Sequence, residues 1–215
     1  MQDISSQLAV YAAGIKEGSR VLDVCAAPGG KSLLAADILK GTGSVLARDI
    51  SEDKVRLINE NIQRLGLENI RAEVFDAEVF DSASEGRYDT VIADLPCSGW
   101  GVIGRKPDIK YSASREKEEQ LAELQYRILE NACRYVRPGG TLIYSTCTVS
   151  EAENEGNAER FLAEHPDFSP VSLNPLLPEE LRCESAEKGY LQILPDDIKD
   201  GFFIARFANG HPVNV

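Results

Sequence analysis

The chain has 215 residues, of which 43% are apolar and 27% charged, so it can bury a full core and does not resemble a disordered protein. Its formal net charge of −12 disfavours a nucleic-acid partner, unless positive charge is concentrated locally or the chain is part of a longer protein. No apolar run is long enough for a membrane span and no basic-then-apolar signal region opens the chain, so we expect a cytoplasmic protein.

Apolar β-like runs alternate with helical segments, which is typical of βαβ units and a parallel sheet. The expected strands are Arg20–Val24, Ser44–Asp49, Ile70–Phe75, Tyr88–Asp94, Thr141–Ser145 and Gly201–Phe207. The expected helices are one after residues 1–7, then Gly30–Leu39, Glu52–Leu65, Arg115–Tyr135 and Glu151–Glu164. Glycine and proline predict loops at Gly41–Gly43 and Arg137–Gly140. Ser169–Asp200 predicts an irregular segment with one strand at Tyr190–Leu194.

A loop of small residues follows the first strand and opens a helix, with the sequence Asp-Val-Cys-Ala-Ala-Pro-Gly-Gly-Lys from Asp23 to Lys31. Such a loop lets a ligand approach the backbone at a helix N-terminus. Asp49 ends the next strand, where a carboxylate can accept hydrogen bonds from ribose hydroxyls. The loop is not G-x-G-x-x-G, which favours a nucleoside cofactor without phosphates; the alternative is a tight turn with a capping aspartate. Asp76 ends the third strand and could meet an adenine amine or cap a turn.

Two cysteines each follow an expected strand, Cys97 in Asp-Leu-Pro-Cys-Ser-Gly and Cys147 in Tyr-Ser-Thr-Cys-Thr. Reacting groups collect at the carboxyl ends of parallel strands. Two thiols placed in this way, one of them close to Asp94, indicate covalent chemistry rather than packing.

The other three cysteines have different interpretations. Cys25 lies in the glycine loop and is expected to line the cofactor pocket, whereas Cys133 and Cys183 are expected to pack as small apolar residues. With five scattered cysteines, no C-x-x-C pair and two histidines, neither a metal site nor a disulfide framework is expected.

The segment Trp100–Tyr111 is locally basic, with aromatic residues at both ends. It carries Arg105, Lys106 and Lys110, which could contact RNA phosphates; the alternative is a solvated loop.

Together with the closing Asp-Gly-Phe-Phe-Ile-Ala-Arg at Asp200–Arg206, these motifs resemble the RNA cytosine carbon-5 methyltransferases of the Sun/RsmB and NOL/NSUN type. The bacterial branch that methylates small-subunit ribosomal RNA is the most similar, and the resemblance covers essentially the whole chain. It implies one catalytic domain over residues 1–215, dependent on S-adenosylmethionine, with a Rossmann-like α/β fold. The implied sheet is mostly parallel, with about seven strands, the last antiparallel, and helices on both faces.

The resemblance also assigns roles to residues of this chain. The loop formed by Cys25, Ala26, Ala27, Pro28, Gly29, Gly30 and Lys31 would hold the methionine end of the cofactor. Asp49 would hold the ribose, Asp76 the adenine, and Asp94 would lie near the methyl group and the target base. Cys147 would be the nucleophile, and Cys97 would assist release of the product.

Two departures from the family pattern matter. Leu95 replaces the alanine of the usual Asp-Ala-Pro-Cys motif, which we expect to be tolerated. Gln2–Ser6 matches the end of a motif that a glycine-led strand normally precedes, so we expect an RNA-binding part upstream in a larger protein.

The implied reaction is addition of the Cys147 thiolate to carbon 6 of cytosine, followed by methylation at carbon 5. Three other functions stay open. They are methylation of tRNA or another RNA, a catalytically silent RNA- or ribosome-binding module, and an NAD-type oxidoreductase on a similar fold.

Overall fold

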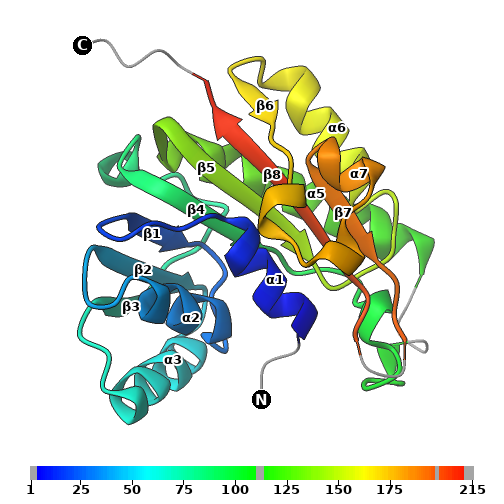
Figure 1. The fold of residues 1–215 in the computed structure, drawn as a ribbon. Helices are drawn as coiled ribbons and strands as arrows, with labels where there is room; N and C mark the ends of the chain where they lie inside the picture. The colour runs from blue at the N-terminus through cyan, green and yellow to red at the C-terminus, as the bar shows by residue number, and fades with distance from the viewer. Residues whose placement is uncertain (1–3, 110–113, 197–198, 211–215) are drawn as a thin grey trace.

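A computed structural model of the chain describes residues 4–109, 114–196 and 199–210, so Lys110 of the basic loop lies outside the described residues. Its helices are α1 (Ile4–Ala12), α2 (Gly30–Ile38), α3 (Glu52–Leu65), α5 (Arg115–Tyr135), α6 (Glu155–Glu164) and α7 (Glu184–Glu187) (Figure 1). Its strands are β1 (Arg20–Asp23), β2 (Ser44–Asp49), β3 (Ile70–Val74), β4 (Tyr88–Asp94), β5 (Val136–Thr146), β6 (Phe168–Pro170), β7 (Tyr190–Ile193) and β8 (Phe202–Asn209). Short 3-10 turns occur at Ser82–Ser84, Trp100–Val102, Asn174–Leu176 and Glu179–Leu181.

The strands form one mixed sheet in the order β3-β2-β1-β4-β5-β8-β6, with β7 also paired to β8. The pairs among β1 to β5 are parallel, whereas β8 runs antiparallel to β5, β6 and β7. The expected α/β fold with a mostly parallel sheet is therefore confirmed. The described sheet has eight strands rather than about seven, because β6 was not anticipated.

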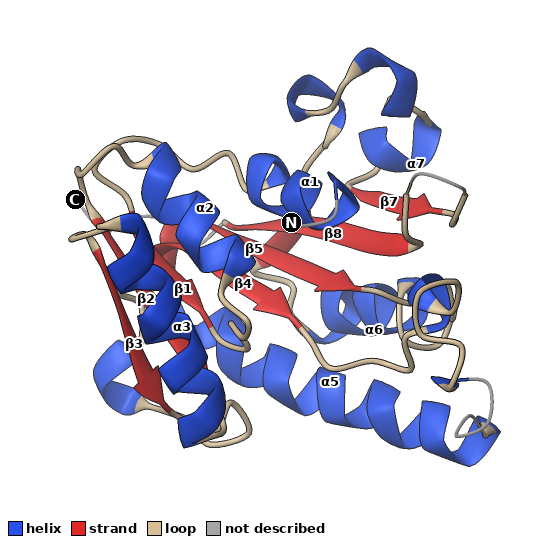
Figure 2. Cartoon of the chain, turned by 90° about the horizontal axis from the view of Figure 1, so that it is seen from below, coloured by secondary structure: helices blue, strands red, loops and turns tan. Residues whose placement is uncertain are grey.

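Helices cover both faces of the sheet, and Figure 2 shows α5 and α6 on one face and α1 and α2 on the other. Alternate residues of one strand serve the two layers. In β4, Val91 and Ala93 pack in the cluster that contains α5, whereas Ile92 packs in the cluster that contains α2. A strand buried on both faces needs an almost continuous apolar run, which is the pattern that marked these strands in the sequence.

Local signals explain where two of the helices begin. The Ser51 hydroxyl accepts a hydrogen bond from the Lys54 backbone N–H at 3.2 Å, so α3 begins at a capped turn. Ser114 caps α5 in the same way, at 3.2 Å from the Lys117 N–H.

Two boundaries differ from the sequence prediction. The Arg137–Gly140 segment, expected as a loop, lies inside β5, where the register with β4 shifts between Tyr88 and Thr90. Helix α6 begins at Glu155 rather than Glu151, because residues 151–154 form a turn. Across the described ranges, no helix combines the length and the apolarity that a bilayer crossing requires.

Candidate active site

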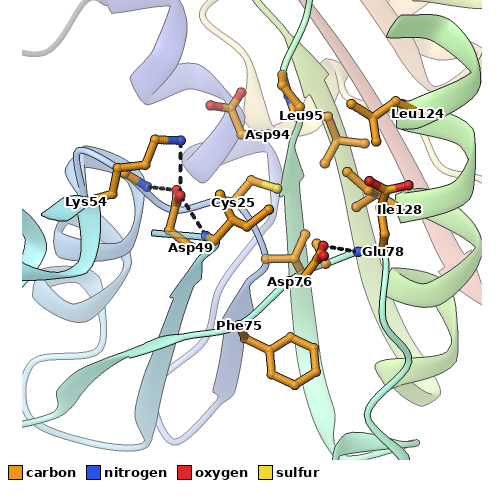
Figure 3. A pocket seen from close by; sticks show the side chains of 15 residues that line it. Cys25, Asp49, Lys54, Phe75, Asp76, Glu78, Asp94, Leu95, Leu124 and Ile128 are labelled. Atoms are coloured by element: carbon orange, nitrogen blue, oxygen red, sulfur yellow. Dashed lines mark hydrogen bonds and ion pairs between the residues drawn. The ribbon is translucent and has the colours of Figure 1, made fainter. Parts of the chain in front are cut away.

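The carboxyl ends of β1, β2, β3 and β4 meet at one edge of the sheet, because these strands are parallel. A cavity of about 270 Å³ opens at this edge. It brings together five residues singled out in the sequence: Cys25, Ala27, Asp49, Asp76 and Asp94. Figure 3 shows Asp49 and Asp76 on the strand side of this cavity, opposite Leu124 and Ile128 of α5.

The glycine loop turns sharply between β1 and α2. Gly29 caps α2 with a left-handed φ of 104°, which a residue with a side chain rarely adopts. Ala26 is buried in a small cluster with Ala47 and Ile58. Pro28 and Gly30 line a different hollow, beside residues of α2 and α3. Of the loop residues, only Cys25 and Ala27 therefore line the cavity with the carboxylates.

Asp49 is held rigidly at the end of β2, and its side chain is 6% exposed. One carboxylate oxygen accepts the Ala27 N–H at 2.9 Å, which fixes the glycine loop to β2. The other accepts the Ile50 N–H at 2.9 Å and lies 3.1 Å from Lys54 Nζ. Lys54 also lines the cavity, and the sequence reading missed it; its place one turn into the helix after Asp49 was the available signal.

The remaining cavity wall combines one carboxylate with apolar side chains. Asp76 accepts the Glu78 N–H at 2.9 Å and faces an apolar surface. This surface was not predicted, because its members come from distant segments: Phe75, Leu95, Pro96, Leu124 and Ile128. The Arg48 guanidinium lies 4.3 Å from the centre of the Phe75 ring and stacks on it from below the cavity wall.

Asp94 links the glycine loop to the two cysteine loops. Lys31 Nζ donates to one of its oxygens at 2.6 Å, and the Ser145 hydroxyl donates to the other at 2.7 Å. Lys31 also donates to the Ser6 hydroxyl at 2.7 Å. Its ammonium and the Asp94 carboxylate therefore form an ion pair at the sheet edge, next to the loop that carries Cys147.

The sulfurs of Cys97 and Cys147 lie 3.2 Å apart, and both thiols are free. The hydrogen bond between them lowers the pKa of Cys147, and the charge of Lys31 acts in the same direction. That hydrogen bond, together with burial, raises the pKa of Cys97. This asymmetry favours a thiolate on Cys147 and a thiol on Cys97, and the thiolate is the nucleophilic form.

Asp23 lies at the end of β1, fully buried beneath the glycine loop. One oxygen accepts the Ser32 hydroxyl at 2.6 Å, and the other has no hydrogen-bond partner among the described residues. Burial raises the pKa of Asp23 to about 7.

In the basic loop, Arg105 forms an ion pair of 3.1 Å with Asp200, and Lys106 is exposed. The structure thus leaves part of the positive charge of this loop at the surface. In the part of the chain that the structure covers, no three His, Cys, Asp or Glu side chains gather as a metal site requires.

The sequence model of the 16S rRNA methyltransferase RsmB/F family matches residues 10–208. The chain belongs to this family. A Bacillus subtilis (strain 168) protein named probable ribosomal RNA small subunit methyltransferase B is 46% identical over 207 residues, which are 95% of this chain. A Serratia proteamaculans (strain 568) ribosomal RNA small subunit methyltransferase F is 36% identical over 99% of this chain.

Among solved structures, NSun6 from Pyrococcus horikoshii with SFG has a TM-score of 0.82 and 28% identity, covering 98% of this chain and 53% of that one. The RsmB/F relatives are longer than this chain. This chain spans 46% of the length of the B. subtilis protein and 45% of the length of the S. proteamaculans protein. The match therefore concerns one part of those proteins.

Proposed function

We propose that this chain is the catalytic domain of an S-adenosylmethionine-dependent RNA cytosine-C5 methyltransferase, with small-subunit ribosomal RNA as its substrate. The observation that carries the proposal is the pair of sulfurs 3.2 Å apart in the segments that follow β4 and β5. Neither of these cysteines lines the cavity, but Asp94, Leu95 and Pro96, which precede Cys97, do. Membership of the RsmB/F family and the names of the two relatives support ribosomal RNA as the substrate.

The donor and acceptor groups of the cavity fit S-adenosylmethionine. Asp49 is placed to accept hydrogen bonds from a ribose, and Asp76 to accept one from the adenine amine beside the apolar wall. The glycine loop, through residues such as Ala27, would hold the methionine end. When bound, the cofactor supplies an electrophilic methyl group. The SFG complex of the P. horikoshii relative supports a ligand at this kind of site.

The two cysteines divide the reaction between them. The Cys147 thiolate adds to carbon 6 of cytosine, which gives carbon 5 the nucleophilic character that methylation requires. Asp94, when it carries a proton or bridges through the Lys31 ammonium that it binds, would hydrogen-bond the pyrimidine edge and stabilise the charge gained at N3.

Release of the product requires loss of the proton at carbon 5. The C–H electron pair then forms the carbon 5–carbon 6 double bond, and Cys147 leaves as a thiolate. Once Cys147 is bonded to carbon 6, Cys97 gives its own proton to solvent, and its thiolate then takes up the carbon 5 proton or relays it to a base. The target base must be unstacked to reach the sheet edge, which costs a few kcal/mol and is easiest in a loop or single strand.

RNA phosphates would meet the surface near Arg105 and Lys106, together with Lys110 outside the described residues. Reduced thiols at the reacting centre also fit the cytoplasmic location expected from the sequence.

The test is methyl transfer from labelled S-adenosylmethionine to a 16S ribosomal RNA transcript, followed by a denaturing gel. Cys147→Ala should abolish transfer and leave cofactor binding intact. Cys97→Ala should still add and methylate but should accumulate a covalent protein–RNA band. Cys183→Ala is the matched control, because this thiol directly precedes α7 and is exposed, rather than packed as the sequence had predicted. A covalent band with Cys147→Ala would reverse the two roles.

The same assay separates the other functions. A tRNA transcript methylated in place of 16S RNA would move the substrate to another RNA. RNA binding without methylation would indicate a silent module, and binding of NADH rather than S-adenosylhomocysteine would indicate an oxidoreductase.

A further inference from the structure

Glu153 is a buried carboxylate to which the proposed reaction assigns no role. Its side chain is fully buried in the turn between Cys147 and α6. One oxygen accepts two hydrogen bonds, and the other has no hydrogen-bond partner among the described residues. Burying a carboxylate is unfavourable unless it is well paired. A half-satisfied carboxylate at this depth therefore needs an explanation beyond packing.

The paired oxygen holds the loop that carries Cys97. It accepts the backbone N–H of Ser98 at 2.9 Å and the side-chain amide of Gln125 at 2.8 Å. The same Gln125 amide donates to the Pro96 carbonyl at 2.9 Å. The residues on both sides of Cys97 are thus fixed to one carboxylate–amide pair.

The backbone of Glu153 is fixed to the segment that carries Cys147. The Tyr144 hydroxyl lies within hydrogen-bond distance of both the Glu153 carbonyl and the Gln125 side-chain oxygen, the latter at 2.9 Å, and shares its one proton between these two acceptors. The neighbouring Asn154 accepts the Thr146 hydroxyl at 2.5 Å and donates to the Thr148 carbonyl at 3.0 Å. Both flanks of Cys147 are therefore tied to this turn.

Glu153 joins these two sets of contacts. Its backbone follows the Cys147 flank, and its side chain reaches the Cys97 flank. The contact between the two sulfurs lies at the end of this connection. Glu153 is fully buried and does not line the cofactor cavity, so it acts on the two thiols through its contacts rather than by touching a ligand.

We propose that Glu153 is a positioning residue that sets Cys97 against Cys147 and thereby controls release of the methylated RNA. The proposal rests on the function proposed above, because it concerns the step assigned to Cys97. Without the carboxylate, the Ser98 N–H loses its acceptor, and the Gln125 amide nitrogen keeps only its hydrogen bond to the Pro96 carbonyl. The Cys97 loop can then move. Cys147, on the other flank, stays fixed, because Asn154 keeps its contacts to Thr146 and Thr148.

The expected phenotype of Glu153→Ala is therefore selective. Addition and methylation should continue, whereas release should slow by roughly 10- to 100-fold, the scale expected for misplacement by about 1 Å. A merely structural role would reduce addition and release together. Glu153→Gln keeps an oxygen that can accept from both Ser98 and Gln125, and it should restore release.

The experiment compares wild type, Glu153→Ala and Glu153→Gln on the 16S ribosomal RNA transcript, with covalent adduct and methyl incorporation measured in single turnover. The matched control is Glu164→Ala. This glutamate lies on α6 and accepts the Tyr126 hydroxyl of α5 at 2.8 Å, away from both cysteine loops. A second RNA, with 5-fluorocytosine in place of cytosine, measures addition and methyl transfer without release, since the fluorine at carbon 5 of the methylated adduct cannot leave as a proton does.

We expect adduct on the normal RNA with Glu153→Ala, unchanged trapping on the fluorinated RNA at a pH where Cys147 is a thiolate in both proteins, and near wild-type release for Glu153→Gln and Glu164→Ala. Fast release by Glu153→Ala would overturn the proposal, as would an equal loss of addition and release. If wild type neither methylates nor is trapped, the proposed function itself fails.

A further variant and a second readout cover loss of folding or of RNA activity. Gln125→Leu removes the donor to Pro96 but leaves the Ser98 contact, and it should give a weaker form of the same phenotype. The second readout is the rate of alkylation of Cys147 as a function of pH, which needs no RNA. The midpoint, the pH of half-maximal rate, should be higher in Glu153→Ala, because a displaced Cys97 no longer donates a hydrogen bond to Cys147. It should be unchanged in Glu153→Gln. An unchanged midpoint in a folded Glu153→Ala would contradict the positioning role even without any methylation.

Discussion

At the scale of single residues, the site depends on carboxylates that share a sheet edge but have different surroundings. Asp49 accepts two backbone N–H groups and pairs with Lys54, whereas Asp23 is buried with one oxygen unpaired. Asp94 is neutralised by the Lys31 ammonium. The same chemical group is therefore a proposed ligand acceptor, a buried group with a raised pKa or an ion-pair partner, depending on its neighbours.

Asp49→Ala should weaken binding of S-adenosylmethionine by about 1–3 kcal/mol, because ribose hydroxyls in a buried site would lose their acceptor. Titration calorimetry measures the change, and a melting curve checks that the glycine loop still folds without the Ala27 contact. Asp53→Ala, at an 84% exposed side chain on α3, is the control. Equal affinity of Asp49→Ala and wild type would remove Asp49 from the cofactor site.

Asp23 predicts a pH-dependent stability of definite sign. Its pKa is about 7 in the folded protein and near 3.8 when unfolded, so the folded state binds more protons between these values. Its stabilising contribution is full below about pH 4 and is lost as pH rises to about 7, by at most about 4 kcal/mol. Asp23→Asn should therefore gain stability relative to wild type between pH 5 and pH 8.

Urea unfolding of both proteins at several pH values measures this difference. Asp89→Asn is the control, because the backbone N–H of Arg20 and the Arg137 guanidinium, which outweigh its partial burial, lower the pKa of Asp89. Its contribution changes only at acidic pH, outside the window. A constant difference between Asp23→Asn and wild type across pH 5 to 8 would show that Asp23 is ionised in the folded protein.

The sequence pointed to the groups to which the proposed function assigns chemistry, but not to the groups proposed to orient them. The groups with assigned chemistry lie at or just after strand ends: Asp49, Asp76, Cys97 and Cys147. The ends of parallel strands can be inferred from the alternation of apolar runs with helical segments. The only sequence signal at Glu153 is its place in the acidic run Glu151–Glu155, and carboxylates are also favoured at the start of a helix. Its contact with Ser98 spans 55 residues, and no local period encodes such a distance.

At the scale of elements, three loops meet through backbone contacts behind the two cysteines. The Gly101 N–H donates to the Cys147 carbonyl at 3.1 Å, and the Gly201 N–H donates to the Gly101 carbonyl at 2.8 Å. A side chain at Gly101 would place its Cβ 2.2 Å from the Gly201 oxygen and 2.8 Å from the Cys147 oxygen. The close approach of these loops explains glycine at this position.

Gly101→Ala should destabilise the protein by about 1–3 kcal/mol, because neither carbonyl can move without displacing its own loop. It should also lengthen the contact between the two sulfurs and reduce methyl transfer. Gly104→Ala, in the same loop, is the control, since a Cβ there meets nothing within 4 Å. Denaturant unfolding and thiol alkylation check both effects; equal stability of the two variants would contradict the close packing.

The elements themselves were largely predictable, because burial on two faces gives β1, β2 and β4 continuous apolar runs. The failures have physical causes. β6 has three residues and is defined by pairing with β8 rather than by its own composition. Arg137–Gly140 contains turn residues, yet strand β5 continues through this segment, and its pairing with β4 shifts register there.

At the scale of the whole molecule, the charge of −12 opposes RNA binding, and the site must rely on local positive charge. Of the expected phosphate contacts, Lys106 is exposed and Arg105 is shared with Asp200. The RsmB/F relatives are about twice as long, so RNA affinity in those proteins can involve surface that this chain does not contain.

We therefore predict that this chain binds single-stranded 16S ribosomal RNA fragments weakly and with a shallow salt dependence. Contacts from Arg105, Lys106 and Lys110 would release few counterions, giving a slope of log K against log salt of about −2. The double variant Arg105→Ala/Lys106→Ala should lower the magnitude of this slope by about 1.4. Lys40→Ala, at an exposed lysine paired with Glu17, should leave it unchanged. Fluorescence anisotropy at a series of salt concentrations measures the slope. Nanomolar affinity at physiological salt, or an equal salt slope in wild type and the double variant, would place the RNA on a different surface.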